Sequence, residues 1–119
     1  MATVLCTGAD RVLNETRALI LRGAGHTAIS AMNELELIEA CTQQRVDVAV
    51  IGQAMPRSEK RYVFRVVRQH CPSAKILELY VPHLGRTLHD ADDWLEVPAR
   101  VPSELVVHVE RLAAKPTSS

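Results

Sequence analysis

The chain has 119 residues, of which 47% are hydrophobic and 24% are charged, the size and composition of one ordinary folded domain. Its 14 basic residues balance its 14 acidic residues, and its aromatic residues are one Trp, two Tyr and one Phe. This argues against a dedicated nucleic-acid-binding protein, and no apolar run approaches the ~20 residues that span a bilayer.

The first half of the chain alternates strand and helix patterns. A β-branched run predicts a strand over 3–7, and helical spacing predicts a helix over about 10–22 with Asp10 as its N-cap. The inward face of this helix is expected to comprise Val12, Leu13, Thr16, Leu19, Ile20 and Gly23. A second strand is predicted over 26–31. Asn33 followed by Glu36 then resembles the capping box of a second helix.

The strongest strand pattern is VDVAVI at 46–51, which is almost continuously apolar, as in a strand buried on both faces. Ser58 is expected to cap a third helix, whose inward residues would be Tyr62, Val63, Val66 and Val67. Ser103 is expected to cap a last helix, with Leu105, Val106, Val109 and Leu112 on one face.

Two further strands are predicted over 75–79 and 93–97, and Pro82 and Gly85 disfavour a long helix between them. Strands that alternate with helices predict a parallel sheet with right-handed crossovers and helices on both faces. We expect a single domain over 3–114 and a flexible tail over 115–119.

The cysteines Cys6, Cys41 and Cys71 are odd in number, widely spaced and without a CxxC pair. This pattern argues against a disulfide framework and against a zinc site. The N-terminus also lacks the basic start of a signal peptide, so we expect a reducing, cytoplasmic location. His83 and His89 lie near several acidic residues but match no recognised metal spacing, so no metal and no cofactor are expected.

Three stretches resemble the receiver domain of two-component response regulators, the CheY-like family. These are TVLCTGADRVLNETRALILRGAGHTAISA, VDVAVIGQAMP and ADDWLEVP, in the family's order and spacing. The resemblance covers about 3–114. It implies an α/β three-layer sandwich whose five parallel strands have the flavodoxin-like order 2-1-3-4-5, and a role in phosphorelay signal transduction.

The phosphorylation chemistry of that family is not matched. The resemblance places Gly52 at the position of the phosphoacceptor Asp, and Gly8 and Ala9 at the acidic pair that holds Mg²⁺. Tyr80 stands for the usual Ser or Thr, and Val97 for the usual Lys. The domain therefore resembles a degenerate receiver, or pseudo-receiver.

Trp94 matches the family's conformational switch aromatic, and the hydroxyl residue that usually partners it is replaced. The stretch from Tyr80 to Trp94 is shorter than in typical receivers, so the family's fourth helix is expected to be short or missing. The family's usual output and dimer face, which includes that helix, must therefore differ here.

These features favour a non-enzymatic signalling domain that contacts an unidentified protein partner without being phosphorylated. The resemblance also suggests a homodimer through the last helix. The candidate interface residues are Trp94, Leu105, Val106, Val109, Arg57, Arg61, Arg65 and Arg68. The four arginines recur at helical spacing beside Lys60; a solvated outer helix face is the favoured interpretation, and the stripe is the best candidate for an electrostatic contact.

Two other functions remain open. Because open parallel sheets bind ligands at the carboxyl ends of their strands, a small-molecule or anion pocket at Gly8, Gly52 and Tyr80 is the alternative. A phosphoaccepting receiver that uses Asp10 or Asp47 is the weakest hypothesis, since Asp47 lies near the start of its strand, at the end opposite the expected site.

A buried Glu78 in the fourth strand would need a partner, either Lys75, an arginine or an interface.

Overall fold

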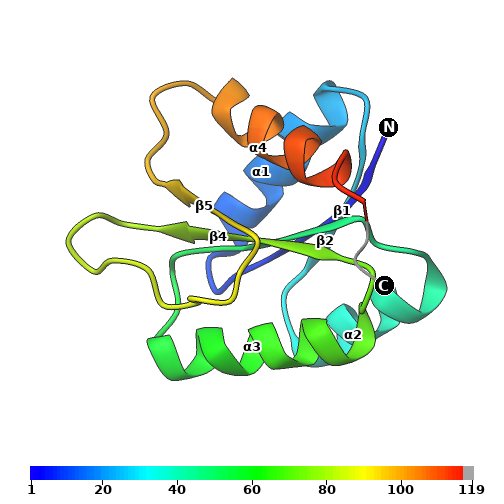
Figure 1. Ribbon diagram of the computed structural model, residues 1–119, viewed down its shortest axis with the longest axis horizontal. Helices are drawn as coiled ribbons and strands as arrows, with labels where there is room; N and C mark the ends of the chain where they lie inside the picture. Colours follow the sequence, from blue (N-terminus) through cyan, green and yellow to red (C-terminus); the bar gives the residue numbers. More distant parts are fainter. Residues whose placement is uncertain (117–119) are drawn as a thin grey trace.

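The computed structural model describes residues 1–116. Its strands and helices follow the predicted order along the chain (Figure 1). The strands are β1 (Thr3–Thr7), β2 (Thr27–Ala31), β3 (Val48–Ile51), β4 (Lys75–Tyr80) and β5 (Asp93–Glu96). The helices are α1 (Arg11–Gly23), α2 (Glu34–Gln43), α3 (Arg57–His70) and α4 (Ser103–Ala113). None of these helices has the length and apolar character needed to cross a membrane. Within the predicted tail, residues 117–119 lie outside the described residues.

The five strands form one parallel sheet in the order β2-β1-β3-β4-β5, which confirms the predicted CheY-like arrangement. Thr7 pairs with Ile51, and Ile51 pairs with Glu78, so the central strands end almost level with one another. The chain changes direction across the sheet between β1 and β3. Their carboxyl ends are therefore where open α/β sheets place a functional crevice.

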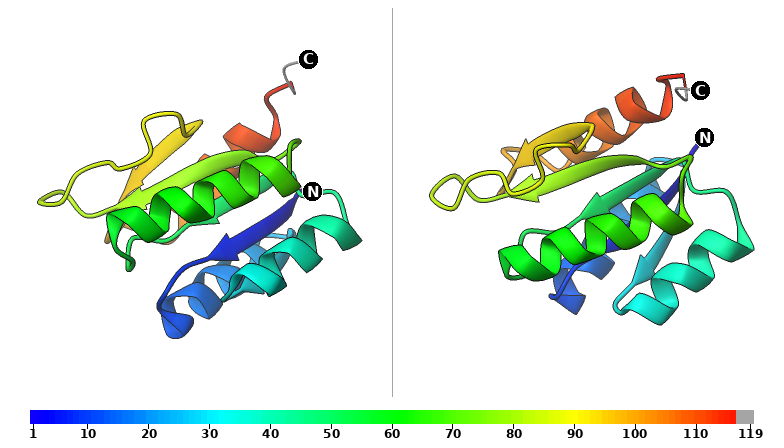
Figure 2. Two further views of the ribbon diagram at one scale, coloured as in Figure 1. Left: turned by 90° about the horizontal axis from the view of Figure 1, so that it is seen from below. Right: turned by 60° about the horizontal axis from the view of Figure 1, so that its bottom comes forward.

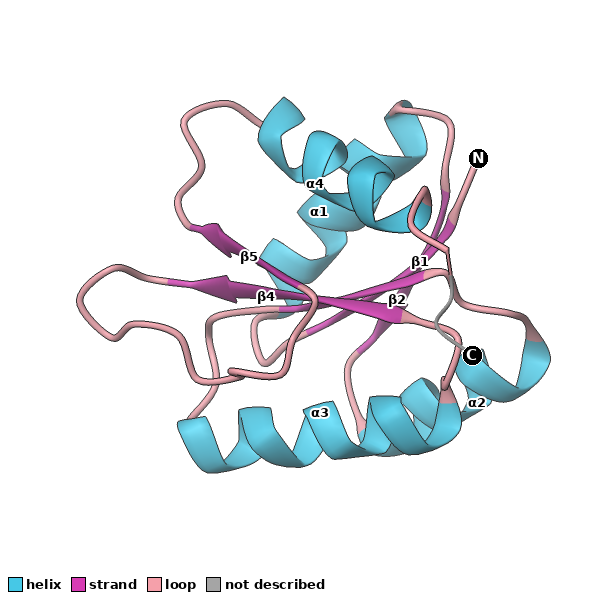
Figure 3. Cartoon of the chain, viewed as in Figure 1, coloured by secondary structure: helices cyan, strands magenta, loops and turns pink. Residues whose placement is uncertain are grey.

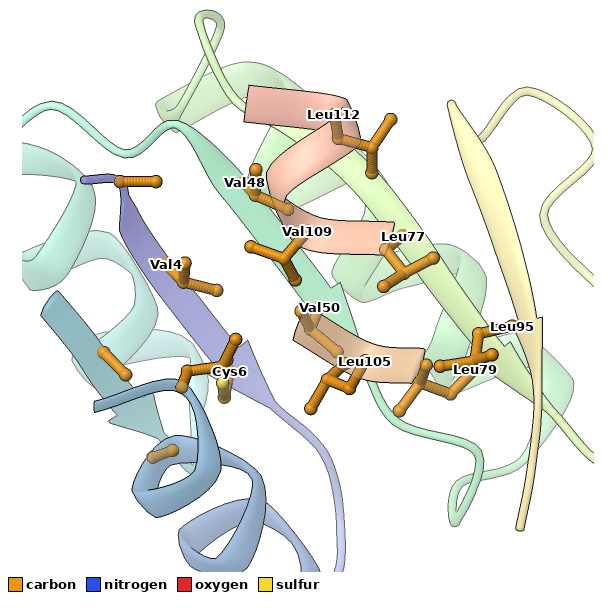
Figure 4. Close-up of a cluster of buried hydrophobic side chains, with 14 of the residues drawn as sticks. Val4, Cys6, Val48, Val50, Leu77, Leu79, Leu95, Leu105, Val109 and Leu112 are labelled. Carbon is orange, nitrogen blue, oxygen red and sulfur yellow. The ribbon is translucent and has the colours of Figure 1, made fainter. Parts of the chain in front are cut away.

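Two helices cover each face of the sheet, α1 and α4 on one side and α2 and α3 on the other (Figures 1, 2 and 3). Alternate strand residues point to opposite layers, so each layer has its own apolar cluster. Figure 4 shows the α4 side, where Leu105, Val109 and Leu112 pack over β3 and β4. Both faces of β3 are buried, as its continuous apolar run predicted.

Helix α1 packs on the sheet through a different face from the predicted one. Its buried residues are Asn14, Ala18 and Leu21. By contrast, Val12 and Leu19 are 74% and 64% exposed. The Asn14 side-chain amide donates to the Cys6 carbonyl over 2.9 Å and to Ser30 Oγ over 2.6 Å. A polar side chain thus anchors the helix, and two large apolar side chains turn outward.

Two of the four predicted helix caps are confirmed. Asp10 accepts a hydrogen bond from the Leu13 amide over 3.1 Å, and Asn33 accepts one from the Glu36 amide over 2.9 Å. Ser58 and Ser103 do not cap their helices, because a proline holds the cap position in each case and makes no side-chain cap bond. The cap positions therefore lie two residues before Ser58 and one residue before Ser103.

Cys41 in α2 and Cys71, directly after α3, form a disulfide with their Cα atoms 5.3 Å apart. The prediction that argued against a disulfide from spacing is therefore wrong. Helices α2 and α3 pack against each other, which brings together two cysteines separated by 30 positions. The cysteine pattern consequently gives no support to a reducing compartment. Cys6 is free and buried in the core.

Candidate functional site

Gly8 and Gly52 lie side by side where β1 and β3 end. The Gly52 amide donates to the Thr7 carbonyl over 2.8 Å, and a Cβ added at residue 8 would stand 3.6 Å from Gly52 Cα. The two positions that the resemblance assigned to phosphorylation chemistry are thus neighbours in space. Neither carries a side chain, so this crevice presents backbone where a nucleophilic carboxylate would be needed.

The side chain of Arg17 reaches from α1 over Gly52. Its Nη1 atom lies 3.1 Å from the position that a Cβ at residue 52 would occupy, and its Nη2 donates to Gln53 Oε1 over 2.7 Å. Burial lowers the pKa of this guanidinium below its ordinary value, but arginine keeps its proton in proteins. A permanent positive charge therefore occupies this end of the sheet.

Sequence reasoning missed Arg17, because the resemblance to receiver domains points only to positions where a phosphorylation group is absent. The available signal was its spacing, since Arg17 stands three residues after Asn14, one before Ala18 and four before Leu21. That spacing places it on the inner stripe of α1. Once the true inner face of the helix is known, an arginine directed at the carboxyl ends of the strands is expected.

Tyr80 is the last residue of β4 and Val97 directly follows the neighbouring strand β5. The Val97 amide donates to the Tyr80 carbonyl over 2.8 Å. Val97 is buried in the core. The Arg86 guanidinium lies over two rings, 5.5 Å from the Tyr80 centroid and 4.6 Å from the Trp94 centroid. Trp94 Nε1 also donates to the Leu88 carbonyl over 3.0 Å. Contacts to the β4–β5 loop thus hold the candidate switch residue.

The β4–β5 loop, residues 81–92, consists of turns and lacks a helix throughout, as predicted. A buried ion pair anchors it. Glu78 is fully buried and its Oε2 lies 2.7 Å from Nζ of Lys60, which is 4% exposed. The same carboxylate accepts hydrogen bonds from the amides of Thr87 and Leu88, over 2.9 and 2.8 Å. The ion pair therefore fixes the loop where receivers have a helix.

The predicted partners of Glu78 were wrong, although its need for a partner was correctly foreseen. Lys60 makes the pair, not Lys75 or an arginine. Lys60 lies three residues before Val63 and seven before Val67, so it shares the inward stripe of α3. Tyr62, which was expected to point inward, is 46% exposed.

The domain itself uses part of the arginine stripe on α3. Arg57 donates to the Leu84 carbonyl, and Arg68 forms an ion pair with Asp92 over 3.2 Å. Both therefore hold the β4–β5 loop against α3. The two stripe residues between them are exposed and make no ion pair with any described residue: Arg61 and Arg65.

The predicted contact surface on the last helix is wrong for two of its residues. Leu105 is 5% exposed and Val109 is fully buried, because the apolar stripe of α4 packs on β3 and β4 (Figure 4). Val106 and Trp94 are partly buried against the two cores. A dimer through α4 would have to use its outer face, where Val107 is 49% exposed.

Gly8 and Tyr80, which were predicted to line one pocket with Gly52, line two different cavities. Gly8 lines a cavity of about 150 Å³ between α2 and α3, whereas Tyr80 lines another of about 240 Å³ beside the β4–β5 loop. Gly52 lines neither, and Arg17 lies over it. Gly8 and Gly52 are neighbours, whereas Tyr80 lines a separate cavity with the β4–β5 loop.

Three aspartates that are candidates for phosphorylation or metal binding have structural roles: Asp10, Asp47 and Asp93. Asp10 caps α1, and Asp47 accepts a hydrogen bond from the Thr3 amide over 2.8 Å, at the opposite end of the sheet. Asp93 contacts His108 over 2.8 Å. Across residues 1–116, no group of three or more His, Cys, Asp or Glu is arranged to hold a metal ion.

No family model matches the sequence, and no curated protein matches it. The structure does resemble solved receiver structures. A response regulator from Thermotoga maritima shares 20% identity and a TM-score of 0.76, covering 97% of this chain and 99% of that one. Vibrio cholerae CheY4 shares 24% identity and a TM-score of 0.75, covering 94% of this chain and 98% of that one.

The receiver domain of the sensor histidine kinase PA1611 from Pseudomonas aeruginosa was solved with magnesium in its active-site cleft. It shares 17% identity and a TM-score of 0.76, covering 96% of this chain and 98% of that one. At these identities the similarity establishes the fold. The chain therefore has the CheY-like receiver fold of two-component signalling proteins.

Proposed function

We propose that this chain is a receiver-like signalling domain that acts by contact with a protein partner and does not accept a phosphoryl group. The observation that carries the proposal is the position of Arg17 over Gly52. A cation from α1 lies against the position that the resemblance assigns to the phosphoacceptor carboxylate.

Phosphoryl transfer to a side chain needs a nucleophile, and a divalent cation that neutralises the developing charge. Mg²⁺ in turn needs carboxylate oxygens at the site. Glycine and alanine at positions 8, 9 and 52 supply no nucleophile and no carboxylate oxygen. The nearby Asp10 already accepts a hydrogen bond as the cap of α1. The positive charge of Arg17 also opposes the approach of a divalent cation.

The exposed arginines of α3, Arg61 and Arg65, support a contact function. Neither makes an ion pair with a described residue, although the Arg65 guanidinium lies 5.9 Å from the centroid of the Tyr62 ring. Both line a depression in which Asp90 is the one acidic residue among the described residues. A cationic surface of this kind is complementary to an acidic segment of a partner. The contact surface is therefore assigned to α3 and not to the buried stripe of α4.

Trp94 provides the test, because it is the single tryptophan of the chain. Its fluorescence is titrated with Mg²⁺ and then with Mg²⁺ plus beryllofluoride, a phosphoryl mimic. The proposal predicts no saturable change in a protein whose circular dichroism shows it to be folded. A saturable change would mean that a working acidic pocket exists, and the proposal would be withdrawn.

A further inference from the structure

We propose that a cavity between α1 and the β5–α4 loop binds a small amphiphilic carboxylate, with Arg17 holding the carboxylate group. The cavity has a volume of about 260 Å³, close to the lower end of the ~300–1,000 Å³ found for small-ligand sites. It opens beside the first half of α1 and the start of α4, in the layer drawn above the sheet in Figure 1.

The walls of this cavity are mostly apolar. Leu13 and Ile20 contribute from α1, and Val81 and Val97 from the residues that directly follow β4 and β5. Leu79, Leu95 and Leu105 form the inner wall and lie close together in Figure 4. Only three lining side chains are polar: Thr16, Arg17 and Gln53. An apolar chamber with a few polar groups is the usual build of a site that orients a small ligand.

Arg17 is the only lining side chain that carries a charge. The side chains of described residues offer it one hydrogen-bond acceptor, Gln53 Oε1, and no described carboxylate forms an ion pair with it. A guanidinium has five N–H donors, so most remain available. Burying a cation is costly: burial lowers the pKa of this guanidinium, and the charge of Asp10 offsets that only in part. A bound anion would supply the direct ion pair that no described carboxylate makes.

The ligand class follows from charge and shape. A guanidinium binds a carboxylate through two parallel hydrogen bonds, and one guanidinium balances one negative charge. A phosphate monoester dianion would need a second cation, which the lining does not contain. The apolar walls require a hydrocarbon portion on the same molecule, because burying that portion supplies most of the binding energy. A short-chain or medium-chain carboxylate satisfies both demands.

Octanoate is the probe. Methyl resonances of the full chain are followed by NMR during titration with octanoate, with octan-1-ol as the uncharged analogue. The expected result is a saturable shift of methyl groups on Leu13, Ile20 and Val97. Arg17→Gln should weaken octanoate binding about tenfold, or ~1.4 kcal/mol, and leave octanol binding unchanged. Arg11→Gln, which removes an exposed arginine from the same helix, is the matched control and should bind as the wild type does.

A second variant covers the case in which Arg17→Gln does not fold. Leu13→Phe narrows the cavity without touching the guanidinium and should reduce the binding of both octanoate and octanol. The proposal is overturned if the folded wild-type chain gives no saturable methyl shift. It is also overturned if Arg17→Gln binds octanoate as tightly as the wild type, because the cavity would then be a plain apolar groove.

Discussion

The Arg17 guanidinium lies over Gly52, with Nη1 3.1 Å from where a Cβ of residue 52 would stand. The contact joins α1 to the residue that follows β3, within the receiver fold, and it is the observation on which the proposed function rests. Glycine at position 52 leaves room for the long side chain, which a Cβ at that position would crowd. The two positions are complementary, so a change at one has a consequence at the other.

Restoring a carboxylate at residue 52 should not restore metal binding. In Gly52→Asp the new side chain would meet the guanidinium of Arg17 and form an ion pair with it, as carboxylates do with a nearby arginine. Gly8 and Ala9 would still supply no second oxygen ligand. Isothermal titration of the variant with Mg²⁺ should therefore give no binding heat. A measurable site would contradict the assigned role of Arg17.

The ion pair between Lys60 and Glu78 should be essential for stability. Lys60→Met leaves a fully buried carboxylate without its cation, and such a change typically costs about 3–5 kcal/mol of unfolding free energy. The double variant Lys60→Met with Glu78→Leu should recover part of the loss. It should not recover all of it, because the Thr87 and Leu88 amides lose their acceptor.

Urea unfolding of the two variants and the wild type measures these differences. Arg61→Met is the matched control on the same helix, since Arg61 is exposed, and it should change the unfolding free energy by less than about 0.5 kcal/mol. A cost for Lys60→Met as small as that of the control would contradict the anchoring role of the ion pair.

The disulfide between Cys41 and Cys71 should stabilise the packing of α2 on α3. Its cysteines are separated by 30 positions, and the chain-entropy relation for a closed loop of that size gives about 3–4 kcal/mol. Cys41→Ser with Cys71→Ser should lower the unfolding free energy by that order, and a reducing agent should lower it equally in the wild type. Insensitivity of the wild type to the reducing agent would show that the bond does not form.

The buried thiol of Cys6 should make stability fall at alkaline pH. Burial raises its pKa from 9.0 to about 12. The unfolded chain therefore loses this proton first, and the folded state becomes less stable as the pH rises from about 9 towards 12. Wild type and Cys6→Ala are compared by urea unfolding at a series of pH values. The wild type should show the steeper decline, and parallel curves would contradict the assignment.

The sequence predicted features that depend on local pattern. The apolar run at 46–51 contains β3, and the caps Asp10 and Asn33 lie where their spacing placed them. Partner choice is tertiary and could not be predicted in the same way. Lys60 resembled its exposed arginine neighbours until the fold placed it beside Glu78. The α1 face was predicted wrongly because Asn14, a polar residue, makes the buried contact.

At the candidate site, too, the local sequence features were predictable and the tertiary contact was not. The absence of carboxylates at Gly8, Ala9 and Gly52 is visible in the sequence, once the resemblance supplies the frame. The group that stands in their place is not visible, because Arg17 reaches Gly52 from 35 positions away in the chain. Its role follows from the rotation of α1, which only the packed structure defines.

Intact mass spectrometry after incubation with Mg²⁺ and acetyl phosphate, a small phosphoryl donor, tests the central claim most directly. A phosphorylatable receiver domain treated in parallel confirms that the donor is active. We predict that the mass of this chain stays unchanged while that of the control rises by one phosphoryl group. A gain of one phosphoryl group on this chain, mapped to any residue between Gly8 and Val97, would contradict the account.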